Sequence, residues 1–252
     1  MLHAGLLRSP STGRIGASGK ALDWPAQLRA LAARAQDSRL KAFFSAPMVD
    51  ADTPLSAAPL LAMDIETTGL DPQRDGIVSI GLVPMSLQRI RASESRHWLL
   101  KPRVALGADS VTIHGITDSS VAQAPDLLEV LGEVLDAIAG VIVVVHCRAV
   151  ERQFLDHALR SRIGEGISFP VIDTMELEAR FRPAARGGLF GRLFGQRAAP
   201  LSIRLADCRQ RYGLPRYRPH HAMTDALAAA ELLQAQISHH FSPEVPIGQL
   251  WK

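Results

Sequence analysis

The chain is poor in cysteine: Cys147 and Cys208 are the only two among 252 residues. So few cysteines exclude a fold held together by several disulfides and favour a reducing compartment. No apolar run approaches the roughly 20 residues that a membrane-spanning helix needs. No secretory signal is apparent, because the apolar pair Leu6-Leu7 is too short for the core of a signal peptide. No internal repeat is apparent either. We therefore expect a globular, cytoplasmic protein without a membrane partner.

An excess of charge of one sign is also missing. Lys and Arg total 28 against 25 for Asp and Glu, and the net charge of +3 is too small to indicate a nucleic-acid partner by itself. The basic residues are unevenly placed, however, since ten arginines and one acid, Asp207, lie between Arg180 and Arg218. This stretch favours a surface that follows phosphates, and a solvated arginine face is the alternative.

The length allows one domain of ordinary size with extensions, and the 47% hydrophobic content supports a real core. We expect a disordered tail over residues 1–22 and an N-terminal helical extension over 23–57. A single α/β domain is expected over 58–242, followed by a C-terminal tail over 243–252. Within the domain, residues 182–200 hold four glycines and two prolines without clear periodicity. That composition predicts a flexible loop.

Apolar patterns predict five strands inside this domain, at 60–66, 76–85, 96–100, 141–145 and 167–172. The expected helices lie within 24–44 and at 125–139, 149–161, 201–212 and 222–240. Short links between the first three strands predict an antiparallel meander, whereas strand, helix and strand in succession after residue 140 predict a parallel crossover. The pattern therefore predicts a central mixed sheet flanked by helices.

The first strand of this set carries two carboxylates, in the run Leu-Leu-Ala-Met-Asp-Ile-Glu-Thr-Thr-Gly-Leu at 60–70. Side chains alternate along a strand, so Asp64 and Glu66 point the same way. Two carboxylates about 4 Å apart repel by roughly 4 kcal/mol at an effective dielectric constant near 20. A cation is therefore expected, and Mg2+ or Mn2+ suits oxygen ligands and the cleavage of phosphodiesters. The alternative is an exposed edge strand with two solvated acids.

Three motifs resemble, in the same chain order, those of the DEDDh 3'-5' exonucleases. Residues 64–69 (Asp-Ile-Glu-Thr-Thr-Gly) resemble the first motif. Residues 146–151 are similar to the second, in which a histidine is followed five residues later by an acid that opens a helix. Residues 220–225 (His-His-Ala-Met-Thr-Asp) resemble the third, His-x-Ala-x-x-Asp. The segment His-Gly-Ile-Thr at 114–117 also resembles a recurrent element of this family, whereas the first 57 residues fall outside the resemblance.

The resemblance implies a fold, an activity and cofactors. The group includes the proofreading subunit of bacterial DNA polymerase III, ribonuclease T and oligoribonuclease, which have a ribonuclease H-like α/β fold. It implies release of nucleoside 5'-monophosphates from single-stranded 3' ends of DNA or RNA with two divalent cations, Mg2+ or Mn2+. The implied partners are those 3' ends and a polymerase or another protein, and homodimers occur in parts of the family.

The resemblance also implies a role for five residues. Asp64 would bridge both metals, Glu66 and Asp225 would complete the first metal site, and Glu151 would support the second. His220 would be the general base, because an imidazole can accept a proton from water near neutral pH. Its position in the loop before a helix would let it swing in when substrate binds.

Four further residues are candidates for substrate binding: Thr67, Thr68, Leu70 and His114. By resemblance, Thr67 and Thr68 would offer amides or hydroxyls to the terminal 3'-hydroxyl, and turn formation is the alternative. Leu70 would touch the last base. His114 would line the substrate groove or pack a helix, whereas His146 is expected to cap or pack its helix.

Two positions leave alternatives open. Glu151 stands where the family has an aspartate that is one methylene shorter, so a module that binds nucleic acid or a polymerase without efficient turnover is the second hypothesis. His221 competes with His220 for the role of the base, because it lies four residues before Asp225. A ribonuclease H-type endonuclease shares the carboxylate chemistry, but the His-x-Ala-x-x-Asp pattern favours cleavage from an end.

Overall fold

The computed structural model describes residues 22–107, 112, 114–181 and 202–252. The expected flexible loop at 182–200 lies outside the described residues, as does the expected N-terminal tail apart from Leu22.

The centre of the fold is a five-stranded sheet with the order β3-β2-β1-β4-β5. Its strands are β1 Leu60–Thr67, β2 Ile77–Met85, β3 Arg96–Leu99, β4 Ile142–Val145 and β5 Val171–Asp173. Strand β1 pairs antiparallel with β2 and parallel with β4, and β4 pairs parallel with β5. The predicted mixed sheet, made of a meander and a parallel crossover, is confirmed.

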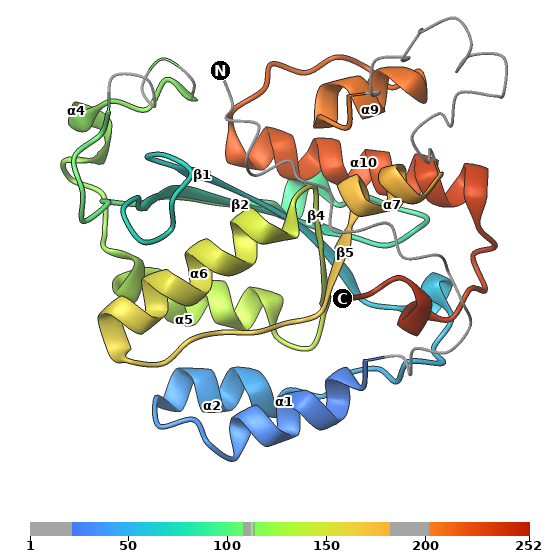
Figure 1. The fold of residues 1–252 in the computed structure, drawn as a ribbon, viewed down its shortest axis with the longest axis horizontal. Helices are drawn as coiled ribbons and strands as arrows, with labels where there is room; N and C mark the ends of the chain where they lie inside the picture. Colours follow the sequence, from blue (N-terminus) through green and yellow to red (C-terminus); the bar gives the residue numbers. More distant parts are fainter. Residues whose placement is uncertain (1–21, 108–111, 113, 182–201) are drawn as a thin grey trace, which may run out of the picture.

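Helices cover both faces of this sheet in layers (Figure 1). The α-helices are α1 Trp24–Ala32, α2 Ser38–Ser45, α4 Asp118–Val121, α5 Leu127–Ile138, α6 Arg148–Ile163, α7 Thr174–Phe181, α9 Leu205–Arg211 and α10 Ala222–His240, and the 3-10 helices are η1 Leu55–Ala57, η2 Ala92–Glu94 and η3 Ile247–Gln249. Helices α7 and α10 lie on one face with α9 beyond them, and α5 and α6 lie on the other (Figure 1). Helices α1 and α2 form a further layer beneath α5 and α6.

Several elements differ from the prediction, and the last strand and helix α7 are the clearest cases. The last strand begins at Val171 rather than at Ile167, although Ile167 and Phe169 are buried. Their apolarity reflects burial in the core, because β4 pairs only with residues 171–173 of this segment. Helix α7 is absent from the prediction: Asp173 ends the strand and also caps this helix, since its Oδ1 accepts hydrogen bonds from the backbone N–H groups of the second and third helical residues.

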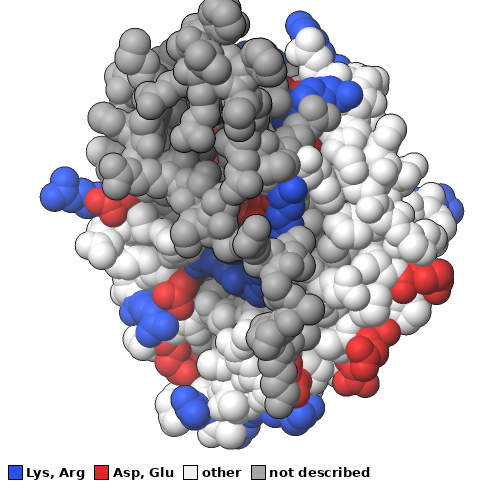
Figure 2. Space-filling view, turned by 45° about the vertical axis from the view of Figure 1, so that its right-hand side comes forward, with Lys and Arg blue, Asp and Glu red and all other residues white. Residues whose placement is uncertain are grey.

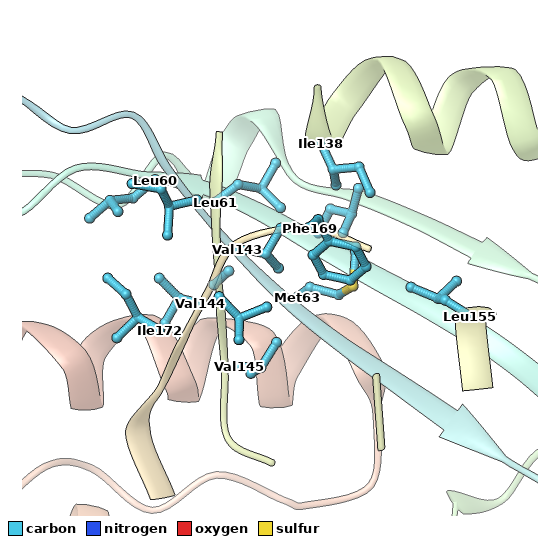
Figure 3. Packing of buried hydrophobic residues seen from close by; sticks show 14 of the residues in the cluster. Leu60, Leu61, Met63, Ile138, Val143, Val144, Val145, Leu155, Phe169 and Ile172 are labelled. Carbon is cyan, nitrogen blue, oxygen red and sulfur yellow. The ribbon is translucent and has the colours of Figure 1, made fainter. Parts of the chain in front are cut away.

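The core continues through both faces of β4, which is fully buried. On the α6 side, Met63 lies close to Phe169 and Leu155 (Figure 3). The N-terminal helices join the same cluster, because Trp24 of α1 and Leu40 of α2 are buried in it. The predicted N-terminal extension is therefore packed against the domain, and its proposed boundaries stay predictions.

The predicted C-terminal tail at 243–252 is packed as well. Trp251 is buried, and the backbones of Lys252 and Val171 donate hydrogen bonds to each other's carbonyl groups, with N···O distances of 2.9 and 3.3 Å. This pairing covers the outer edge of β5, which would otherwise expose unpaired backbone groups. None of the helices within the described residues is long and apolar enough to cross a membrane.

Candidate metal centre

Parallel strands gather the acidic residues of the three motifs at one edge of the sheet. The carboxyl ends of β1, β4 and β5 lie at the same edge because these strands are parallel. Strand β1 ends with Asp64 and Glu66, and Glu151 follows β4 in the first turn of α6. Asp225 comes from the first turn of α10. The fold therefore brings together acids that lie far apart in the sequence.

Three of these acids form a compact cluster. One carboxylate oxygen each from Asp64, Glu66 and Asp225 lies within 4.8 Å of the others. Strand alternation accounts for the first two, as the sequence predicts, and Asp225 reaches them from the helix above. Glu151 is not part of this trio, but it lies close enough that its charge adds to the effects of burial and of Glu66 in raising the pKa of Asp64.

The cluster resists ionisation when no cation is bound. Burial raises the pKa of Asp64 well above its usual range, and the charges of Glu66 and Glu151 raise it further. Burial, followed by the charge of Asp225, raises the pKa of Glu66 to about 8. Burial also raises the pKa of Asp225. Grouped carboxylates of this kind ionise readily only when a positive charge compensates them.

Glu151 supplies an independent observation. Its side chain is 2% exposed, and its Oε2 makes no hydrogen bond to any described residue. Burial raises its pKa well above the usual range, and the charge of Asp173 adds to the effect. A buried carboxylate oxygen without a partner costs free energy. A divalent cation, or water bound to one, would satisfy it, so the residues present fit such an ion.

A glycine lets the third motif approach the first. Gly81 of β2 lies directly opposite Asp64 of β1. A Cβ atom placed on Gly81 would come within 2.3 Å of the backbone carbonyl carbon of Ala222 and the backbone nitrogen of Met223. The start of α10 therefore rests on the sheet where a side chain is missing, and this contact places Asp225 above Asp64.

The two histidines of the third motif have different surroundings. His220 is exposed, has a backbone φ of 68° and donates its backbone N–H to Asp225 Oδ2 at 2.7 Å. The ring of His221 stacks on that of His97, with ring centres 4.9 Å apart. Partial burial lowers the pKa of His97, and the proximity of His221 lowers it further. The ring of His221 is thus engaged with a residue of β3.

The four substrate-binding candidates lie at the loop after β1 and in the segment before α4. Thr67 Oγ1 donates to the carbonyl of Gly69 at 2.6 Å. Thr68 Oγ1 donates to Asp75 at 3.1 Å, which shows the turn chemistry that was its alternative role. Leu70 is half-buried, and burial followed by the proximity of His220 lowers the pKa of His114.

His146 has the packing role that the sequence predicts. Its Nδ1 lies 2.8 Å from Thr174 Oγ1, and its Nε2 lies 2.9 Å from the carbonyl oxygen of Ile203. Burial lowers its pKa to about 4, so the ring is neutral at physiological pH. It therefore fixes α7 and the segment before α9 relative to the sheet.

Part of the arginine-rich stretch is neutralised by acids that lie outside it in the sequence. Its described members include Arg180, Arg209 and Arg211, which form ion pairs with acidic residues at Glu176, Glu231 and Glu178, respectively. The phosphate-following surface stays a prediction, but Arg209 and Arg211 are engaged by acids distant in the sequence, which local composition does not show. On the face drawn in Figure 2, the described basic and acidic residues are interspersed.

The sequence does not predict three residues that contact or support the site: Gly81, His97 and Asp173. Asp173 ends β5, which runs in the same direction as β1 with Asp64, and that position could have identified it. A glycine inside a strand indicates close approach of another backbone, which is the role of Gly81. No local pattern marks His97.

The sheet order, the flanking helices and the placement of the motifs define a ribonuclease H-like fold of the DEDDh exonuclease type. Residues 61–233 match the family model RNase_T, described as exonuclease. The chain belongs to this exonuclease family.

Individual relatives agree with this assignment. The chain is 32% identical over 182 residues to a DNA polymerase III subunit epsilon-like protein of Rhodobacter capsulatus, covering 72% of this chain and 24% of that protein. It is 29% identical to the DNA polymerase III subunit epsilon of Treponema pallidum, covering 71% and 76% of the two chains. The chain spans only 12% to 24% of the first three relatives that it matches.

A solved structure shares the fold. The nuclease domain of 3'hExo, a DEDDh family member bound to rAMP, superimposes with a TM-score of 0.58 at 17% identity, covering 72% of this chain and 92% of that one.

Proposed function

We propose that the chain is a metal-dependent 3'-5' exonuclease that releases nucleoside 5'-monophosphates from single-stranded 3' ends of DNA or RNA. The observation that carries the proposal is the cluster of Asp64, Glu66 and Asp225, with Glu151 close by and its buried Oε2 without a hydrogen-bond partner among the described residues. Clustered acids next to a negatively charged substrate are useful only when cations bind between them.

Two divalent cations, Mg2+ or Mn2+, fit this set of oxygen ligands. Asp64 would contact both ions, Glu66 and Asp225 would complete one site, and Glu151 would support the other. When bound, the ions would supply positive charge to the scissile phosphate and the leaving oxygen. The protein's own contribution is to hold four carboxylates in a buried position from two strand positions and two helix starts.

His220 is the proposed general base. Its ring is exposed, and its backbone is tied to Asp225, one of the acids of the cluster. An imidazole in this place can take the proton of an attacking water near neutral pH. The alternative base, His221, has its ring stacked on His97, and this contact favours His220.

The proposed substrate contacts lie beside the cluster. Thr67 and Leu70 would approach the terminal nucleotide from the loop after β1, and His114, close to His220, would line the same groove. Thr68 would act through its backbone amide or by holding the turn, since its hydroxyl is engaged with Asp75.

Relatives suggest the setting in which the reaction would occur. The relative from Treponema pallidum is a polymerase III epsilon subunit, so a polymerase is a proposed partner alongside single-stranded nucleic acid. A cytoplasmic location and a homodimer are part of the same proposal.

A second candidate function follows from Glu151. Because it replaces the aspartate of the family motif, a module that binds nucleic acid or a polymerase without efficient turnover is the competing proposal. The retained Asp64, Glu66, His220 and Asp225 support the enzyme, since a binder does not need an acidic cluster next to an anionic ligand.

The test is degradation of 5'-labelled single-stranded DNA and RNA oligonucleotides with Mg2+, Mn2+ or EDTA. The unaltered chain should give a metal-dependent ladder that shortens from the 3' end, and Asp64→Ala and His220→Ala should abolish it. Asp136→Ala, which changes an exposed acid on α5, is the matched control and should leave the ladder unchanged. Intact oligonucleotides that the protein nevertheless retains on a filter would support the binding module instead.

A further inference from the structure

A row of three residues crosses the sheet beneath the start of α10. Asp64 on β1 pairs with Gly81 on β2, and Gly81 pairs with His97 on β3. Residues directly opposite one another on paired strands point to the same face. The backbone at Ala222 occupies the space over Gly81, so the first turn of α10 is seated between Asp64 on one side and His97 on the other.

The start of α10 lacks the usual means of fixing a helix end. His221 is the N-cap residue, but its side chain makes no hydrogen bond to the backbone of the first turn. Its ring instead stacks on His97, with the two ring planes at 29°. Helix starts are normally held by a side-chain oxygen of Ser, Thr, Asp or Asn that accepts from the first-turn amides. Here the aromatic stack occupies the place of such a cap.

The residue before this cap is strained. His220 has a φ of 68°, a conformation that non-glycine residues adopt at a cost of about 1 kcal/mol or more. Such a conformation persists only when neighbouring contacts enforce it. The contacts that do so here include the hydrogen bond from the His220 N–H to Asp225 Oδ2, the 3.4 Å contact between His221 Nδ1 and Thr224 Oγ1, and the stacking of His221 on His97.

We propose that His97 is a positioning residue that holds His221 by ring stacking and thereby fixes His220 and Asp225 at the start of α10. Asp225 and His220 belong to the site, whereas His97 acts on it through His221. The role of His97 in turnover rests on the proposed exonuclease function. Its role in holding the start of the helix does not.

The first test therefore needs no turnover. Amide hydrogen exchange is measured for His220 and Asp225 in the unaltered chain and in His97→Ala, His97→Phe and His221→Ala, with thermal unfolding to confirm that each variant is folded. His97→Ala should speed exchange of these amides about 3- to 10-fold, the range that one aromatic pair contributes. Exchange of the β4 amides should not change. His97→Phe, which keeps a ring for stacking, should restore the protection, and His157→Ala on α6 is the control histidine.

A double-mutant cycle decides whether the two histidines act together. If His97 works through His221, the variant with both alanines should exchange no faster than either single variant. Additive effects, or unchanged exchange in His97→Ala, would overturn the proposal whether or not the chain cleaves nucleic acid.

The second test uses metal binding and kinetics. Mn2+ titrated by calorimetry in the absence of substrate should bind His97→Ala several-fold more weakly, because Asp225 is less well fixed, and His97→Phe should bind it as the unaltered chain does. In the oligonucleotide assay, kcat should fall about 3- to 10-fold in His97→Ala while KM stays within about twofold. A rise in KM alone would mean that His97 contacts substrate and would overturn the positioning role.

Discussion

The guanidinium group of Arg152 lies over the ring of Trp24, 5.2 Å from the ring centre. The same group donates hydrogen bonds to the backbone carbonyls of Phe169 and Lys252. Arg152 thus connects helix α1, the segment before β5 and the C-terminal residues to α6. Because it follows Glu151 directly, it also anchors the turn of α6 that carries this acid.

Replacing Arg152 with methionine should lower the free energy of unfolding by about 2–4 kcal/mol, because two carbonyl groups lose a charged donor in a partly buried place. Urea unfolding followed by circular dichroism measures the change. Arg160→Met is the matched control on the same helix, since its side chain is 60% exposed and pairs with Asp156. It should cost less than about 1 kcal/mol. Equal losses would contradict the anchoring role of Arg152.

The acidic cluster predicts how the metal-free protein responds to pH. The pKa of Glu66 is raised from 4.5 to about 8 in the fold, and those of Asp64 and Glu151 are raised as well. At a pH between the ordinary pKa of Glu66, 4.5, and its value in the fold, about 8, the folded protein holds a proton that the unfolded chain has lost. Stability in EDTA should therefore fall as pH rises from about 5 to about 8, by up to about 1.4 kcal/mol per pH unit for one such group.

Thermal unfolding in EDTA across this pH range measures the effect. Mg2+ or Mn2+ should raise the midpoint more at about pH 8 than at about pH 5, because metal ligands must be deprotonated. Asp64→Asn should flatten the profile, and Asp136→Asn, which changes an exposed acid, should not. A midpoint in EDTA that rises steadily over this range would show that the cluster does not govern stability.

The sequence predicts the site better than it predicts the contacts around it. The spacing of Asp64 and Glu66 on a strand is enough to place both on one face, and the structure confirms it. The approach of Asp225 follows only from the family resemblance, since it depends on the missing side chain of Gly81. The stack of His221 on His97 is a contact between distant segments that no local pattern encodes.

Prediction of the fold is limited in the same way, because local patterns do not show which segments pair. Hydrophobic periodicity predicts the bounds of most strands and helices to within a few residues of those observed. It does so because it reflects which side chains are buried. It starts the last strand too early at Ile167, since a buried residue need not pair in the sheet. It also misses α7, because Asp173 both ends a strand and caps this helix, and apolar periodicity shows neither role.

Glu151 should separate stability from catalysis. Its buried carboxylate has an unpartnered Oε2 and a raised pKa, so Glu151→Gln should leave the metal-free protein as stable as before at about pH 5 and more stable at about pH 8. Metal-dependent cleavage should fall by roughly 10- to 100-fold, as expected when a group that supports a bound metal is lost.

A shorter acid at position 151 tests whether the length of this side chain matters for cleavage. Glu151→Asp removes one methylene, which should cost about 1 kcal/mol of stability in a buried place. Cleavage should stay within a few-fold of the unaltered chain, since the carboxylate is kept. If Glu151→Gln cleaves as fast as Glu151→Asp, Glu151 does not support a metal. Both variants are compared in the oligonucleotide assay and in urea unfolding.

Gly81 and Gly132 offer the same substitution with opposite expected results. A Cβ on Gly81 would meet backbone atoms of Ala222 and Met223 at 2.3 Å, and backbone cannot turn aside as a side chain can. Gly81→Ala should therefore displace the start of α10, lower the free energy of unfolding by about 1–3 kcal/mol and weaken cleavage and Mn2+ binding together, because Asp225 moves with the helix. Gly132 lies inside α5, and a Cβ there meets no described atom within 4 Å.

Gly132→Ala should consequently stabilise the protein by about 0.5–1 kcal/mol, because alanine loses less conformational freedom in a helix than glycine does. Its cleavage rate should not change, since α5 lies on the face of the sheet opposite α10 (Figure 1). Urea unfolding and the oligonucleotide assay, run on both variants side by side, measure the difference. If Gly81→Ala also gained stability and kept its cleavage rate, the close approach of α10 to the sheet would not be what places Asp225 in the cluster.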